Sequence, residues 1–169
     1  MSLSKPTKIT TCLWFDGRAS EAASHYITIF PNSRITHTTH YTAAGQELHG
    51  QTPGSVQTVS FTLDGHAFVG LNGGPHFKFS EAVSFMIECN SQEQVDHYWE
   101  RLGEGGDPAK QQCGWVADKF GLSWQVTPKV LFEYLSSEDK EAAGRAAGAM
   151  MGMRKLEIEG LKKAFEGKE

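Results

Sequence analysis

The chain has 169 residues, of which 39% are hydrophobic and 21% charged, and its formal net charge is −4. This length and composition suit an ordinary folded domain and exclude a disordered chain. The mildly acidic balance argues against nucleic acid and anionic membranes as partners, and no apolar run approaches the ~20 residues of a membrane span.

The cysteines indicate a reducing compartment. Cys12, Cys89 and Cys113 lie far apart, their number is odd, and no C-x-x-C pair occurs. This pattern argues against a disulfide framework or a zinc knuckle. The first ten residues also lack the apolar core of a signal peptide. We therefore predict a cytoplasmic protein.

The first half of the chain predicts the order strand, helix, strand, strand, strand. β-Branched and aromatic residues predict a strand at 8–16, and apolar residues at helical spacing then predict a helix that ends before Pro31. A second β-branched run predicts a strand at 33–41. The polar, glycine-rich segment 42–54 predicts a loop.

A hairpin follows this loop. Apolar and polar residues alternate along 56–63, which predicts a strand with one buried face. Asp64-Gly65 is a strong hairpin turn sequence, so 67–71 is expected to return as the next strand.

The pattern then restarts. A strand is predicted at 83–88, and Ser91 begins a helix. Aligning His25-Tyr26 with His97-Tyr98 gives one offset that also superimposes the preceding strands. Two unrelated strand–helix pairs could match by chance, but a shared offset favours an internal repeat of one βαβββ unit.

The second repeat and the tail are less regular. Segments 112–119 and 122–127 predict a hairpin, while 105–111 is only a weak third strand. Segments 129–135 and 138–166 have helical composition. Glycines four residues apart form a stripe that we expect to pack closely on another helix or on the sheet: Gly144, Gly148 and Gly152.

None of the common local motifs for a metal, a nucleophile or a nucleotide occurs in the sequence. The seven histidines make no H-x-H or H-E-x-x-H pair, and no G-x-S-x-G, G-x-G-x-x-G or Walker sequence opens a helix. Cys113, beside Gly114, is either an accessible nucleophile or a buried thiol. Aromatic residues on predicted strands form either an apolar pocket or core: Trp14, Phe85, Trp115 and Trp124.

Several segments together resemble one protein family. They are Leu13-Trp14-Phe15-Asp16-Gly17, Leu71-Asn72-Gly73-Gly74-Pro75, Gln112-Cys113-Gly114-Trp115 and the hairpin from Asp118 to Val126. This set resembles the PhnB-like, or 3-demethylubiquinone-9 3-methyltransferase-like, subgroup of the vicinal oxygen chelate (glyoxalase/bleomycin resistance/dioxygenase) superfamily, over roughly residues 8–165.

The resemblance implies an α+β fold of two βαβββ modules that form a curled mixed sheet around a ligand cup. The modules would span 8–75 and 82–127, with a helical tail at 128–166, in one compact domain. Superfamily members usually hold a divalent metal through His and Glu on four strands.

At the corresponding positions this chain carries Cys12, Asn72, Ser84 and Gln125. Neutral oxygens are poor ligands for a catalytic transition metal. The prediction is therefore a cup without a metal and without a cofactor.

The implied site holds a small-molecule ligand. Its catalytic candidates are Asp16, Cys113 and Gln125, and its ligand-binding candidates are Cys12, Trp14, Asn72, Ser84, Met86, Trp115 and Trp124. Three functions stay open at this point: an enzyme that uses those polar groups, a sequestering protein without turnover, and the methyltransferase of the family name.

The assembly is predicted to be a homodimer. Superfamily modules often pair across two chains, and the weak strand at 105–111 leaves a sheet edge that proteins usually cover. A monomer whose tail folds back on its own sheet is the alternative.

Overall fold

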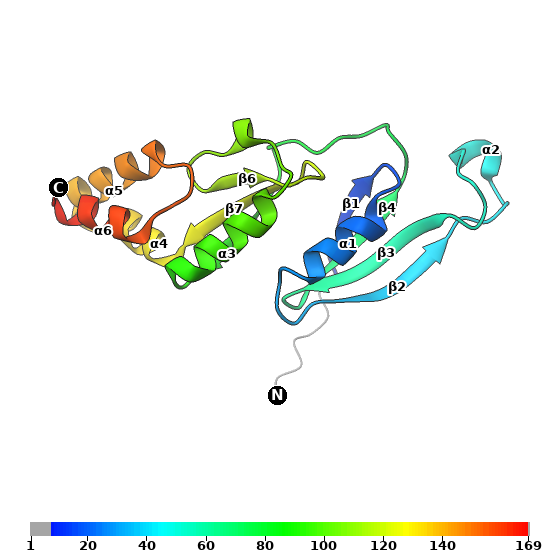
Figure 1. Cartoon of the computed structure of the whole chain (residues 1–169), viewed down its shortest axis with the longest axis horizontal. Coiled ribbons are helices and arrows are strands. Elements are labelled where there is room, and N and C mark those ends of the chain that lie inside the picture. The colour runs from blue at the N-terminus through cyan, green and yellow to red at the C-terminus, as the bar shows by residue number, and fades with distance from the viewer. Residues whose placement is uncertain (1–7, 169) are drawn as a thin grey trace. The chain divides into compact units, whose positions relative to one another are not determined.

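The computed structural model describes residues 8–168, and the chain divides between Lys78 and Phe79 into two compact units (Figure 1). Each unit contains one mixed β-sheet with its own helices, and neither sheet closes on itself. The α+β fold class predicted from the sequence, with two mixed sheets, is confirmed. Among the helices of residues 8–168, none combines the length and hydropathy that a membrane span requires.

The first unit has the predicted βαβββ order. Its elements are β1 (Thr11–Phe15), α1 (Ala19–Ile27), β2 (Arg34–His40), α2 (Gln46–His49), β3 (Val56–Leu63) and β4 (His66–Asn72). The strand order is β1-β4-β3-β2, with β1 parallel to β4 and the other pairs antiparallel. The segment expected to be a loop contains the short helix α2, which is flanked by Gly45 and Gly50, both with positive φ.

Strand alternation places the core of this unit under α1, which crosses one face of the sheet (Figure 1). Leu13 and Phe15 are buried, whereas Cys12 between them is exposed. The predicted hairpin turn is present, because Asp64 and Gly65 both have positive φ (44° and 81°), as the tight turn requires.

The second unit combines a three-stranded sheet with most of the helices. Its elements are β5 (Ser84–Cys89), α3 (Gln92–Gly103), the 3-10 helix η1 (Pro108–Lys110), β6 (Trp115–Ala117), β7 (Ser123–Pro128), α4 (Lys129–Leu135), α5 (Lys140–Gly152) and α6 (Ile158–Glu166). The strand order is β5-β7-β6, with β5 parallel and β6 antiparallel to β7.

The segment that was predicted as a weak third strand is not a strand. Asp107 accepts a hydrogen bond from the Ala109 N–H (2.9 Å), and Pro108 occupies the first turn of η1, where its missing N–H has no cost. Upstream, a Cβ added at Gly106 would overlap the carbonyl oxygen of Ala117. The backbone therefore passes directly against β6 here instead of pairing as a strand.

Both units share one pattern. In each, a helix follows the first strand, and the first strand pairs in parallel with the last: β1 with β4, and β5 with β7. This pattern supports an internal repeat. The superposition of the two modules, and the module boundaries 8–75, 82–127 and 128–166, stay predictions.

The tail differs from its prediction in two respects. Segment 138–166 forms two helices, α5 and α6, instead of one continuous stretch. The expected close packing of the glycine stripe is wrong, because a Cβ added at Gly144, Gly148 or Gly152 would meet nothing within 4 Å. Helix α5 instead buries the opposite side, through Ala142, Ala143 and Ala146.

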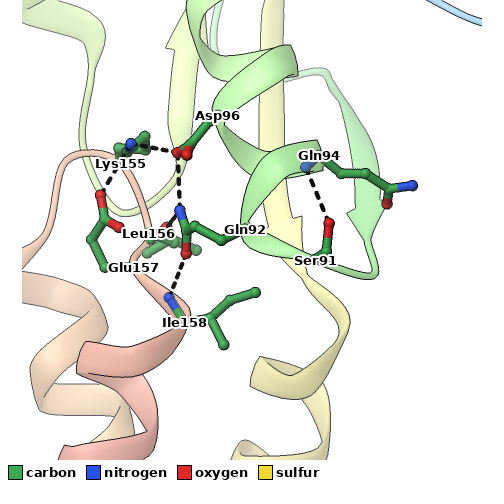
Figure 2. Close-up of polar contacts among 8 residues, drawn as sticks. All are labelled: Ser91, Gln92, Gln94, Asp96, Lys155, Leu156, Glu157 and Ile158. Atoms are coloured by element: carbon green, nitrogen blue, oxygen red, sulfur yellow. Dashed lines mark hydrogen bonds and ion pairs between the residues drawn. The ribbon is translucent and has the colours of Figure 1, made fainter.

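A polar cluster ties the loop between α5 and α6 to the start of α3 (Figure 2). The Gln92 side chain donates to Asp96 Oδ1 (3.0 Å) and to the Leu156 carbonyl (3.2 Å), and it accepts from the Ile158 N–H (2.8 Å). Lys155 forms ion pairs with Asp96 and, at 3.2 Å, with Glu157. The loop that follows α5 is thereby fixed against the sheet-bearing part of the unit.

We expect Asp96→Asn to destabilise the second unit by about 0.5–1 kcal/mol at pH 7, since the ion pair is partly exposed. Hydrogen bonds from Lys155 and Gln92 lower the pKa of Asp96. The stabilisation is therefore complete above the unfolded pKa of about 3.9 and is lost as the pH falls through the folded pKa.

Urea unfolding at pH 7 and at pH 3 would measure this effect, with Glu100→Gln, an exposed charge on the same helix, as the control. An Asp96→Asn deficit that is equal at both pH values would contradict the role of the ion pair.

Candidate functional site

A cavity of about 680 Å³ lies within the second unit. A Cβ added at Gly103, the last residue of α3, would contact Val116, so Val116 faces α3. Its neighbour Trp115 lines the cavity, as does Gln125, which is paired with Trp115 across the β6–β7 ladder. The cavity therefore lies on the face of the sheet that points away from α3.

The floor of the cavity is a row of side chains in register. Met86 on β5, Gln125 on β7 and Trp115 on β6 lie side by side across the sheet. Gln125 donates from Nε2 to the Ser84 hydroxyl (2.8 Å), and Thr127 lies two residues further along β7 on the same face. The floor thus presents an aromatic ring, a thioether, an amide and a hydroxyl.

The C-terminal helices supply a second wall of the cavity. Helix α4 contributes Leu131, Phe132 and Leu135, and helix α5 contributes Met150 and Met151. Leu131 belongs to a buried cluster with Leu156 and Leu161, against which Met150 packs. Because methionine side chains are flexible and polarisable, this wall can adapt to ligands of different shape.

A strained turn connects floor and wall. Cys113 has a φ of 52°, which is uncommon for a residue with a side chain, and Gly114 has a φ of 82°. Their N–H groups donate to the carbonyls of Met153 and Arg154, both at 2.8 Å. The Cys113 thiol lies 3.6 Å from the Met151 carbonyl oxygen. The α5–α6 loop thus holds Cys113 at the cavity surface.

The only ion pair among the lining side chains of the described chain joins Lys110 and Glu81 at 2.7 Å. Their mutual hydrogen bond lowers the pKa of Glu81 and raises the pKa of Lys110. Because the two opposite charges are paired and both side chains are substantially exposed, neither leaves an uncompensated charge inside the cavity.

The structure brings part of the predicted site together. Met86, Cys113, Trp115 and Gln125 line the cavity, and Ser84 is hydrogen-bonded to Gln125. Trp124 lies on the α3 side of β7, where it is 2% exposed and its indole N–H donates to Asp118 Oδ2 (2.8 Å). It does not line this cavity.

The remaining predicted residues belong to the first unit. The Asn72 amide is engaged by the backbone, since Oδ1 accepts from the Ala19 N–H (2.9 Å) and Nδ2 donates to the Val56 carbonyl (3.1 Å). Trp14 donates to the Gly74 carbonyl (2.8 Å) and meets Phe77 edge-on. Cys12 and Asp16 are exposed. All of these lie outside the second unit's cavity.

Two parts of the cavity lining were not predicted from the sequence: Thr127 and the residues of helices α4 and α5. Thr127 could have been found, because it lies two residues after Gln125 on a predicted strand and so shares its face. The tail residues carry only a helical apolar pattern, which does not distinguish a cavity wall from a core.

The donors at this site do not suit a catalytic metal. Residues 8–168 contain no group of three His, Cys, Asp or Glu side chains that could hold an ion. The floor offers an amide and hydroxyls, which are weak ligands for a transition metal. Absence of a metal, self-association as a homodimer and cytoplasmic location stay predictions.

The family follows from comparison with known proteins. The profile of the 3-demethylubiquinone-9 3-methyltransferase family matches residues 7–127. The chain belongs to this family. The resemblance noted in the sequence is therefore confirmed, although the profile match ends at residue 127, short of the expected residue 165.

Solved structures agree with this assignment. The PhnB protein from Bacillus cereus is 32% identical, with a TM-score of 0.60, over 72% of this chain and 99% of that one. Protein PA1353 from Pseudomonas aeruginosa shares the fold at 18% identity, with a TM-score of 0.52, over 70% of this chain and 95% of that one. No curated protein matches the chain significantly.

Helices α4, α5 and α6 lie beyond the profile match. One wall of the cavity is thus built from residues outside the matched region, whereas its floor lies within it.

Proposed function

We propose that this protein is a member of the vicinal oxygen chelate superfamily that binds a small molecule of low polarity in the cavity of its second unit, and sequesters it without turnover. The observation that carries the proposal is the cavity itself. Its volume of about 680 Å³ lies in the range of small-molecule sites, and its wall is built from leucine, methionine and aromatic side chains.

The polar groups of the cavity support binding over catalysis. An acid–base enzyme needs a titratable group within reach of its substrate. Apart from Cys113, the lining groups that can ionise are Lys110 and Glu81, which neutralise each other. Gln125 and Thr127, the polar side chains of β7, can orient a ligand but cannot exchange protons with it at neutral pH.

The methyltransferase named in the family description fits this cavity poorly. S-adenosylmethionine carries a sulfonium and an amino-acid group, and each of these charges needs a partner when it is buried. The charged side chains of the lining are already paired with each other. The cavity therefore suits a neutral ligand better than this cofactor.

A neutral fluorescent probe tests the proposal. We expect N-phenyl-1-naphthylamine to bind with micromolar affinity, and Met86→Glu to weaken binding at least tenfold by placing a charge against the apolar probe. Saturating S-adenosylmethionine is expected to leave the probe in place. Fluorescence titration measures both results.

Val83→Glu is the matched control. Val83 is an exposed apolar residue (66%) immediately before β5 that does not line the cavity, and Met86 is comparably exposed (54%). The two substitutions should therefore affect folding equally and binding differently. Absence of probe binding, equal losses in both variants, or displacement by S-adenosylmethionine would each refute the proposal.

A further inference from the structure

Sulfur-containing side chains gather at the cavity of the second unit. The chain has five methionines, and three of them line this cavity together with one cysteine: Met86, Met150, Met151 and Cys113. The sulfur atoms of Cys113 and Met151 lie 3.8 Å apart. Thioethers and thiols are the side-chain groups that oxidants convert most readily to polar products. The lining therefore contains groups whose polarity an oxidant can change.

Exposure divides the methionines of residues 8–168 into two pairs. Met86 is 54% exposed and Met151 is 63% exposed, and both line the cavity. Met150 and Met153 are partly buried, because they pack against the buried leucine cluster of the tail. An oxidant in solution must reach the sulfur atom before it can react with it. The two methionines that it reaches most easily are therefore both at the cavity.

Oxidation of these side chains would change what the cavity can bind. Hydrogen peroxide transfers one oxygen atom to a thioether sulfur: the O–O bond breaks, the sulfur loses two electrons, and water leaves. The resulting sulfoxide is strongly polar. The neighbouring wall residues Leu131, Phe132 and Leu135 offer its oxygen no side-chain donor. Against an apolar ligand the sulfoxide would lose its hydration without a compensating hydrogen bond, which is unfavourable.

We propose that Met86 and Met151 are sites of reversible oxidation by peroxides, and that their oxidation releases the apolar ligand from the cavity. The release rests on the proposed function, because it requires a bound ligand, whereas the modification does not. Methionine sulfoxide reductases return the sulfoxide to the thioether, as two thiols become a disulfide and the oxygen leaves as water. The cavity would then bind its ligand again.

Peptide mapping by mass spectrometry, after brief treatment of the full chain with hydrogen peroxide, locates the modification. We expect sulfoxide to form at Met86 and Met151 at least about fivefold faster than at Met150 and Met153, because oxidation follows exposure. Dithiothreitol is added afterwards, since it reverses sulfenic acids and disulfides, including any at Cys113, but leaves methionine sulfoxide. Equal rates at all four methionines would overturn the assignment of the sites.

Titration with N-phenyl-1-naphthylamine, once the peroxide has been removed, measures the release. We expect the affinity of the wild-type protein to fall about tenfold or more, and to return after incubation with methionine sulfoxide reductases and dithiothreitol. The double variant Met86→Leu/Met151→Leu carries apolar side chains of similar volume that peroxide does not attack. Its affinity should be the same before and after treatment, with each protein's own untreated affinity as the reference.

The double variant Met150→Leu/Met153→Leu is the matched control, because it removes as many thioethers and leaves the two exposed ones in place. It should lose affinity after treatment as the wild type does. A wild-type affinity that persists although Met86 and Met151 are oxidised, or a loss of affinity in the Met86→Leu/Met151→Leu variant, overturns the release.

Failure of the untreated wild type to bind the probe refutes the proposed function and the release with it, whereas the peptide map still decides the sites of modification. If a double variant does not fold, the wild-type peptide map and the wild-type affinities before treatment, after treatment and after enzymatic reduction decide alone.

Discussion

Replacing Gly114 with alanine is expected to destabilise the second unit by about 3 kcal/mol and to abolish the proposed binding of the fluorescent probe. A side chain at a φ of 82° costs roughly 1–2 kcal/mol by itself. The new Cβ would also lie 2.9 Å from Leu156 Cδ1 and 3.0 Å from the Val126 carbonyl oxygen. Leu156 lines the cavity, so its displacement changes the site as well as the core.

Gly121→Ala separates these two effects. Gly121 has a φ of 87°, and a Cβ there would meet nothing within 4 Å. The backbone penalty is therefore the same and the steric penalty is absent. Urea unfolding, followed by tryptophan fluorescence, should place Gly121→Ala about 1–2 kcal/mol below the wild type, with probe binding intact. Equal destabilisation by both variants would show that packing against Leu156 is unimportant.

Asp118→Ala should also destabilise the second unit by about 3 kcal/mol. Asp118 is 2% exposed, and its Oδ1 accepts from the N–H groups of Phe120 (2.8 Å) and Leu122 (3.0 Å). Its Oδ2 accepts from the buried Trp124 indole N–H. The substitution removes the acceptor of all three donors, and bonds to a charged acceptor in a buried site are among the strongest.

Asp107→Ala serves as the comparison, because Asp107 makes the same kind of bond, to the Ala109 N–H, in an exposed position. Its loss should cost no more than about 1 kcal/mol. Thermal unfolding followed by near-ultraviolet circular dichroism would report the environment of Trp124 directly. A melting temperature for Asp118→Ala as high as that of Asp107→Ala would contradict the importance of the buried carboxylate.

Local signals predicted much of the fold. Strand β3 was predicted with its observed bounds, since its alternation is strict and Asp64-Gly65 fixes its end. Ser91 was correctly predicted to begin α3, where its side chain accepts a hydrogen bond from the Gln94 N–H. Both features depend on residues that are close in the sequence.

Features that depend on distant contacts were predicted less well. Segment 105–111 fails to form a strand where Gly106 lies against Ala117. The glycine stripe of α5 suggested a packing face, but Ala142, Ala143 and Ala146 on the opposite side of the helix are the buried residues. Composition alone does not decide which side of a helix meets its neighbour.

The candidate site shows the same division. Gln125 and Trp124 were both proposed as site residues, yet neighbours on a strand point to opposite faces, so only one could face the cavity. Register decided in favour of Gln125, which pairs with Met86 and Trp115. The tail's contribution was not visible in the sequence, because it depends on how α4 and α5 pack after the end of β7.

The family match ends at residue 127, whereas the lining of the cavity continues into the C-terminal helices. The polar lining residues Gln125 and Thr127 lie within the matched region, whereas the apolar lining residues Leu135 and Met151 lie beyond it. Comparison with family members therefore covers the floor of the cavity but not the wall that the C-terminal helices supply. Two family members with similar sequences over the matched region can therefore differ in the size and shape of this cavity, because residues after 127 form part of its lining.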